Sequence, residues 1–184
     1  MGRTYTAGRA HAELASPLTF PQESVTLRIP MSDGCTIVTF QSSAFNTSQP
    51  KDYFINECCY GDDLARWLIA ELRRSGIRTD TDPGQEDFGW YFGFRVGGTD
   101  YHLVLGYRPD EEDSDGVWIG WLERNLGFMR SLFGGRKRHI RPEAAGALHS
   151  VLSSSPNIRN VRWHLQRDFD CGNETSARPD PSAN

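Results

Sequence analysis

The stretch that decides the fold is FGWYFGFRVGGTDYHLVLGYR, residues 88–108. In its first half, large apolar side chains alternate with smaller or polar ones, which is the period-2 pattern of a β-strand. Gly97 and Gly98 follow, and two adjacent glycines accept the positive φ angles of a tight hairpin turn. The pattern then alternates again, so we predict a β-hairpin with one buried aromatic face. The positions expected on that face are Phe88, Trp90, Phe92, Phe94, Val96, Tyr101, Leu103, Leu105 and Tyr107.

Three apolar stretches outside the hairpin extend this sheet. Residues 117–123, VWIGWLE, predict a third strand, which completes a three-stranded antiparallel meander over 88–123. Residues 36–45 begin as a strand rich in β-branched and aromatic side chains, and residues 157–169 predict the last strand. The antiparallel sheet is therefore expected to contain about four to five strands.

Two other stretches have helical periodicity. Residues 62–76 begin with two aspartates, which suit the positive end of a helix dipole, and their apolar side chains recur on one face. Residues 142–154 begin with a proline, which helices accept in their first turn. Residues 125–133 are expected to form a short amphipathic helix or an ordered loop. The element order becomes β-α-β-β-β-(α)-α-β, an α+β fold with two main helices packed on one face of the sheet.

Composition indicates one folded domain with polar ends. The chain has 184 residues, 38% of them hydrophobic, which fits one domain of roughly 100–200 residues. Residues 1–30 lack a secretory apolar run and are expected to form a flexible leader. Residues 31–169 are expected to form the single α+β domain, and the polar residues 170–184 a disordered tail.

The same composition excludes several classes of protein. No run approaches the roughly 18 apolar residues of a membrane helix, so no membrane association is expected. The four cysteines have no zinc-ligand spacing, so we expect reduced thiols, a cytoplasmic protein, and neither a metal nor a cofactor.

Charge is distributed unevenly along the chain. Residues 80–123 contain eleven acidic residues and two arginines, a net charge of −9, whereas residues 124–169 have a net charge of +7. Such a separation favours electrostatic steering toward a polar partner. The alternative is that the two halves face each other across surface salt bridges, which contribute little to stability.

The face of the meander opposite the aromatic one carries glycines. Gly89, Gly93 and Gly106 share it, and Gly120 is expected to join them. Glycine in a strand often marks a close approach of backbone or ligand, which favours a shallow binding platform. The alternative is that the glycines let large rings lie flat across them or let the sheet twist. The side chains expected around the platform are Tyr91, Arg95, His102, Arg108 and Trp118.

One arrangement of residues could support catalysis. Cys58 and Cys59 precede the first helix, whose N-terminal dipole can lower the pKa of a thiol. His102 or His164 could then act as the base of a cysteine-dependent hydrolase. Cysteine is also a commonly buried residue, so the leading interpretation assigns no catalytic residue.

A second alternative is binding of RNA or single-stranded nucleic acid through a basic sheet face. The expected face has a stacking ring, Tyr91, and a basic rim formed by Arg95, Arg108, Arg162 and His164. The basic stretch that contains Arg136, Lys137 and Arg138 would add phosphate contacts.

The leading interpretation is a non-catalytic module that binds a protein partner. By architecture and charge layout the chain is similar to small bacterial α+β proteins that hold another protein, such as toxin-neutralising immunity proteins and secretion chaperones. Interfaces favour tryptophan, tyrosine and arginine. The expected contacts are therefore Tyr91, Arg95 and Trp118 with the acidic loop 109–115, or the basic stretch 136–141.

Overall fold

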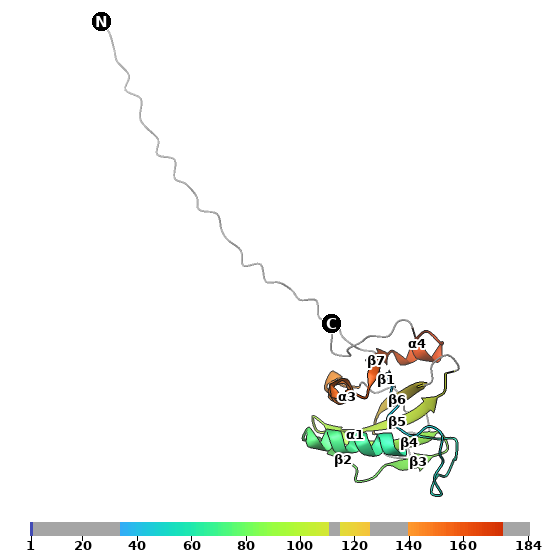
Figure 1. Ribbon diagram of the computed structural model, residues 1–184. Coiled ribbons are helices and arrows are strands. Elements are labelled where there is room, and N and C mark those ends of the chain that lie inside the picture. Colours follow the sequence, from blue (N-terminus) through green and yellow to red (C-terminus); the bar gives the residue numbers. More distant parts are fainter. Residues whose placement is uncertain (2–33, 111–114, 126–139, 175–184) are drawn as a thin grey trace. The chain divides into compact units, whose positions relative to one another are not determined.

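A computed structural model describes Met1 and residues 34–110, 115–125 and 140–174 (Figure 1). The expected leader, all but the first residue of the expected helix at 125–133, and residues 175–184 lie outside these ranges. The chain divides into two units, Met1–Pro30 and Met31–Asn184, and every element below belongs to the second.

The described residues form a seven-stranded antiparallel sheet in the order β2-β4-β5-β6-β1-β7, with β3 also paired to β4 (Figure 1). The strands are β1 (Ile37–Gln41), β2 (Arg78–Thr79), β3 (Gly84–Glu86), β4 (Gly89–Val96), β5 (Thr99–Arg108), β6 (Val117–Arg124) and β7 (Arg159–His164). The predicted α+β class and the central meander are confirmed. The strand count exceeds the expected four to five because residues 79–87, which contain only turn-forming signals, also supply short strands that pair with β4.

Two helices cover one face of the sheet, as predicted. They are α1 (Asp62–Arg74) and α3 (Pro142–Ser154), which contact each other. Each turns an apolar stripe inward because its apolar residues recur about every 3.6 positions. Leu64, Leu68 and Leu72 of α1 are fully buried in the same cluster as Leu148 of α3 and Phe92 of β4. The core is therefore a single layer of side chains between the sheet and these helices.

The hairpin at 88–108 turns where the sequence predicts. Gly97 and Gly98 have φ angles of 56° and 78°, in the left-handed region that glycine favours. Phe88 departs from the prediction, because it lies in the tight turn between β3 and β4 and is 65% exposed. The apolar alternation of this stretch therefore begins one residue before the strand does.

Strand β6 corrects two predictions about the glycine-bearing face. Trp118 pairs with Tyr107 and Gly120 pairs with Leu105, so both lie on the core face. Trp118 is fully buried rather than part of an exposed platform. A Cβ atom on Gly120 would approach Val38 Cγ1 to 2.8 Å, so glycine here allows β1 to pack closely. Strand β6 carries one tryptophan on each of its two faces, Trp118 and Trp121, so the alternation of apolar residues does not show which face is buried.

The opposite face is filled partly by rings that lie over glycines. Trp121 packs over Gly106, where an added Cβ would be 3.1 Å from the indole ring. Tyr91 packs over Gly84 in the same way, with the corresponding distance 2.6 Å. The structural alternative for the glycines therefore applies at these positions.

The last predicted strand is shorter than expected. Strand β7 ends at His164, and residues 166–170 form the short helix α4 (Gln166–Asp170). The ring of Phe169 lies 5.3 Å from that of His164, so this segment covers the outer face of β7. The described chain continues to Glu174, which pairs with Arg108 of β5, although the tail was expected to begin at residue 170.

Candidate functional site

Three large apolar side chains are exposed in the described part of the folded unit. Tyr53 is 54% exposed, Ile55 is 68% exposed and Phe88 is 65% exposed. The first two belong to the loop 51–60, which precedes α1, and the third to the turn between β3 and β4. We call these three side chains the loop–hairpin surface. Such exposed apolar clusters are typical of interaction sites when they are contiguous.

Hydrogen bonds hold the loop against the hairpin. The backbone N–H of Ile55 donates to Gln85 Oε1 at 2.7 Å, and Gln85 Nε2 donates to the carbonyl of Asn56 at 3.2 Å. Asn56 Nδ2 donates to the carbonyl of Asp87 at 3.2 Å, and the thiol of Cys59 donates to the same carbonyl at 3.5 Å. Two segments about thirty residues apart in sequence are thus fastened into one surface.

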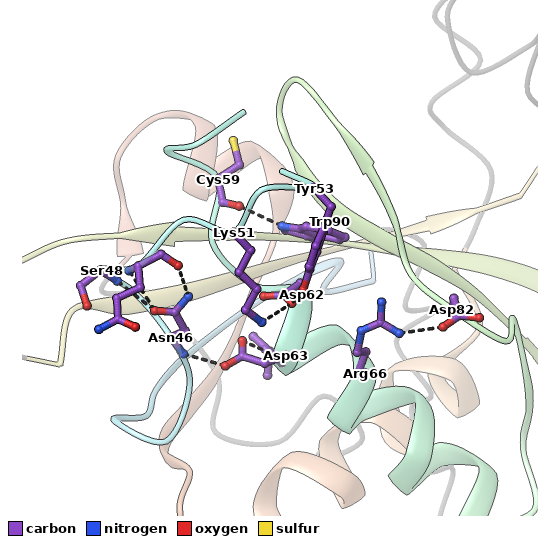
Figure 2. Close-up of polar contacts among 12 residues, drawn as sticks. Asn46, Ser48, Lys51, Tyr53, Cys59, Asp62, Asp63, Arg66, Asp82 and Trp90 are labelled. Atoms are coloured by element: carbon purple, nitrogen blue, oxygen red, sulfur yellow. Dashed lines mark hydrogen bonds and ion pairs between the residues drawn. The ribbon is translucent and has the colours of Figure 1, made fainter. Parts of the chain in front are cut away.

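A buried carboxylate anchors the start of the loop to α1. Asp62, the first residue of α1, is 1% exposed, and its Oδ2 accepts from Lys51 Nζ at 2.6 Å and from the hydroxyl of Tyr53 at 2.5 Å (Figure 2). Burial alone would raise the pKa of Asp62, but the hydrogen bonds from Lys51 and Tyr53 outweigh it and lower that pKa. The hydrogen bond to Asp62 likewise raises the pKa of Lys51.

Trp90 of β4 forms the buried wall beneath this loop. Its indole Nε1 donates to the carbonyl of Cys59 at 2.8 Å, and its ring meets Tyr53 edge-on with centroids 6.2 Å apart (Figure 2). Phe54, which is buried, packs on the same ring at 5.3 Å. The exposed side chains of the loop are therefore carried on a fixed backbone. This arrangement suits recognition, because a loop that is already ordered loses little conformational entropy when a partner binds.

The side chains predicted for the platform are divided between different environments. Tyr91 and His102 lie together on the outer face with ring centroids 6.0 Å apart, and His102 Nε2 is 3.0 Å from the amide nitrogen of Asn125. Arg95 Nη1 lies 3.3 Å from a carboxylate oxygen of Asp100. Trp118 is in the core. The structure therefore does not assemble the predicted platform as one exposed set.

The predicted basic residues are also dispersed. Arg108 makes a two-pronged contact with Glu174, with distances of 2.8 and 3.0 Å, which raises the pKa of Arg108. Arg162 is exposed on β7, at the far edge of the sheet from β4. The remaining predicted contacts, Arg136, Lys137 and Arg138, lie outside the described residues.

The two oppositely charged halves meet at a described ion pair. Arg159, from the basic half, pairs with Asp115, from the acidic half. This contact is the kind expected if the halves face each other across surface salt bridges. Residues 111–114 and 136–138, which carry much of the charge of each half, lie outside the described ranges.

The structure does not bring the candidate thiols and imidazoles together. Cys59 bonds to the β3–β4 turn and through its carbonyl to Trp90 on the core face, whereas His102 is on the outer face. His164 lies on β7, four strand spacings of about 4.8 Å from β4, where its Nε2 is 2.7 Å from Thr39 Oγ1. Burial lowers the pKa of His164. The contacts of Cys59 therefore pair it with neither histidine, and Cys58 lies next to it in the same loop.

Cys59 also lacks the electrostatic activation that a nucleophile needs. Burial, followed by the nearby Cys58 and Asp87, raises the pKa of its thiol. In a Cys58→Ser, Cys171→Ser background we expect iodoacetamide to modify Cys59 at about pH 7.5 more slowly in the folded protein than in the urea-unfolded protein, where Cys59 is a free thiol. Peptide mass spectrometry measures the rate. A faster reaction in the folded protein than in the unfolded protein would contradict this prediction and revive the hydrolase hypothesis.

Comparison with known proteins yields no relative. The chain matches no family model, no curated protein and no solved structure. In the described ranges no helix is both long and apolar enough to cross a membrane. Within those same ranges, no three His, Cys, Asp or Glu side chains gather in a way that could hold a metal ion. The case for function therefore rests on the geometry of the loop–hairpin surface.

Sequence reasoning missed the three residues of this surface. The loop sequence KDYFINECCY, residues 51–60, mixes apolar and polar residues without a helical or strand period, so its side chains could not be assigned to a face. The available signal was the presence of Tyr53, Phe54 and Ile55 in a segment with no predicted element. Apolar residues in a non-periodic segment are either buried or offered to a partner, and only the fold separates the two.

Proposed function

We propose that this protein is a non-catalytic module that binds another protein through the loop–hairpin surface. The observation that carries the proposal is that Tyr53, Ile55 and Phe88, each more than half exposed, all lie on two segments that hydrogen bonds hold together. Leaving such side chains in water is unfavourable, and a partner that covers them gains apolar burial. Aromatic side chains at the centre of a contact commonly carry most of its binding energy.

Two further observations support this proposal over the alternatives. Cys58, Cys59 and Cys171 form no disulfide, which favours a reducing compartment, and we place the interaction in the cytoplasm. Arg95 and Arg108 lie beside carboxylates, so their charge is already partly neutralised for nucleic-acid phosphates. The proposed role is that of a holding protein, comparable in kind to an immunity protein or a secretion chaperone.

Site-specific photocrosslinking in the native cell tests the proposal. A benzoylphenylalanine placed at Phe88 is expected to give one discrete protein adduct, which disappears when Ile55→Ser is added. The same photoreactive residue at Gln166, an exposed position on α4, serves as the control. Identical adducts from both positions, or adducts indifferent to Ile55→Ser, would show that the surface is not a binding site.

Ile55 and Phe88 are expected to contribute little to the stability of the fold. Because Ile55 and Phe88 are largely exposed, we expect Ile55→Ser and Phe88→Ser each to change the free energy of unfolding by less than about 0.5 kcal/mol. Urea denaturation followed by circular dichroism measures this change. A loss of several kcal/mol would mean that these side chains stabilise the fold, and the binding interpretation would fail.

A further inference from the structure

The loop–hairpin surface has an acidic border. The two segments that build it, residues 51–60 and 84–89, carry four acidic side chains and one basic side chain. Asp52, Glu57 and Asp87 are exposed, and Glu86 is half-buried. Every residue of these two segments is described, so four acidic groups and one basic group give the two segments a formal net charge of −3.

The single cation of the two segments pairs with a buried carboxylate. Lys51 Nζ lies 2.6 Å from Asp62 Oδ2 and 5.7 Å above the ring of Tyr53. Its charge is therefore matched by the buried carboxylate of Asp62 and does not offset the exposed acids. Among the described residues, Asp52, Glu57 and Asp87 form no ion pair. A partner that approaches Ile55 and Phe88 would therefore meet apolar side chains on segments that also carry exposed acidic groups.

We propose that the partner contacts this surface with a segment in which apolar side chains are flanked by lysine or arginine. The inference rests on the proposed binding function and adds the chemistry of the partner. Apolar side chains of the segment would cover Ile55, Phe88 and the ring of Tyr53. The flanking cations would lie against Asp52, Glu57 and Asp87, where complementary charge speeds association and fixes the register of the contact.

Selection from a random peptide library tests the inference. Displayed 16-residue peptides are selected on the immobilised full-length protein and depleted on the Ile55→Ser, Phe88→Ser double variant. The peptides that remain depend on the loop–hairpin surface. We expect them to combine apolar residues with a net positive charge.

Charge-reversal variants then separate attraction by the acids of the loop–hairpin surface from attraction by the net charge of the protein. The best peptide is expected to bind Glu57→Lys roughly tenfold more weakly than the unmodified protein. Asp170→Lys makes the same change of charge at an exposed position on α4 and is expected to alter the affinity less than about twofold. Raising the salt concentration should weaken binding to the unmodified protein more than binding to Glu57→Lys.

The possible failures are distinguishable. If no selected peptide depends on Ile55 and Phe88, the proposed binding function itself fails. If dependent peptides are neutral or acidic, or if Glu57→Lys and Asp170→Lys have equal effects, the surface binds a partner but the cationic partner is wrong. A concentration-dependent dimer in sedimentation that Phe88→Ser abolishes would show instead that a second copy covers the surface, and would also overturn the inference.

Discussion

The Trp118→Ala variant is expected to lose about 3–5 kcal/mol of unfolding free energy, the range for truncating a large buried aromatic side chain. Trp118 is fully buried and meets Tyr107 with ring centroids 4.9 Å apart and Phe45 at 6.1 Å. Its Nε1 also donates to the carbonyl of Ser42 at 3.3 Å, so truncation leaves this carbonyl without that donor. The loss includes both a cavity and a broken hydrogen bond.

Trp121 provides a matched control on the same strand. It points to the outer face, is only partly buried, and packs over Gly106. We expect Trp121→Ala to cost about 1 kcal/mol, well below the loss at Trp118. Urea denaturation followed by far-ultraviolet circular dichroism measures the free energy of unfolding of both variants. This signal reports the backbone, so it can be compared between proteins that have lost different tryptophans. Equal losses at the two positions would contradict the register of β6.

The second large effect is expected at Asp62, which anchors the loop 51–60. Asp62→Asn removes the charge that holds Lys51 and weakens the contact with Tyr53, and we expect a loss of about 2 kcal/mol. The figure is below that for a fully buried ion pair because the side chain of Lys51 is 40% exposed. Amide hydrogen exchange in residues 51–56 should become faster, because the loop has lost its tie to α1.

The acid dependence of stability identifies the cause of this loss. The pKa of Asp62 is lowered in the folded protein, so its contribution is present above the ordinary aspartate pKa of about 3.9. It is lost as the pH falls through the lowered folded value. The unmodified protein should therefore lose more stability than Asp62→Asn on acidification below about pH 4.

Lys51 gives the opposite dependence in alkali. Because its pKa is raised in the folded protein, its contribution is lost as the pH rises above the ordinary lysine value of 10.5. Asp52→Asn, a substitution at an exposed position in the same loop, is the control for both the acid and the alkaline measurements. An Asp52→Asn variant that matched Asp62→Asn in stability and pH profile would rule out a special role for Asp62.

The sequence predicted the fold better than it predicted the surface. Alternation between Trp90 and Val96, followed by two glycines, identified the hairpin, and the leucine spacing of α1 identified the main helix. Strand β6 was found, but its phase was wrong because Trp118 and Trp121 occupy opposite phases. Of the predicted contacts, Tyr91 packs over a glycine on the outer face of the sheet, and Arg95 and Arg108 pair with acidic residues.

By itself, the sequence determined the long strands β4, β5 and β6 and the helices α1 and α3, because the spacing of apolar residues and the turn glycines act over a few neighbouring positions. Tertiary structure alone decided which apolar side chains are left in water. Ile55 and Phe88 are 33 positions apart, and they form one surface only because Gln85, Asn56 and Asp87 join the loop to the turn. Exposure depends on packing between distant segments, and no local pattern encodes that packing.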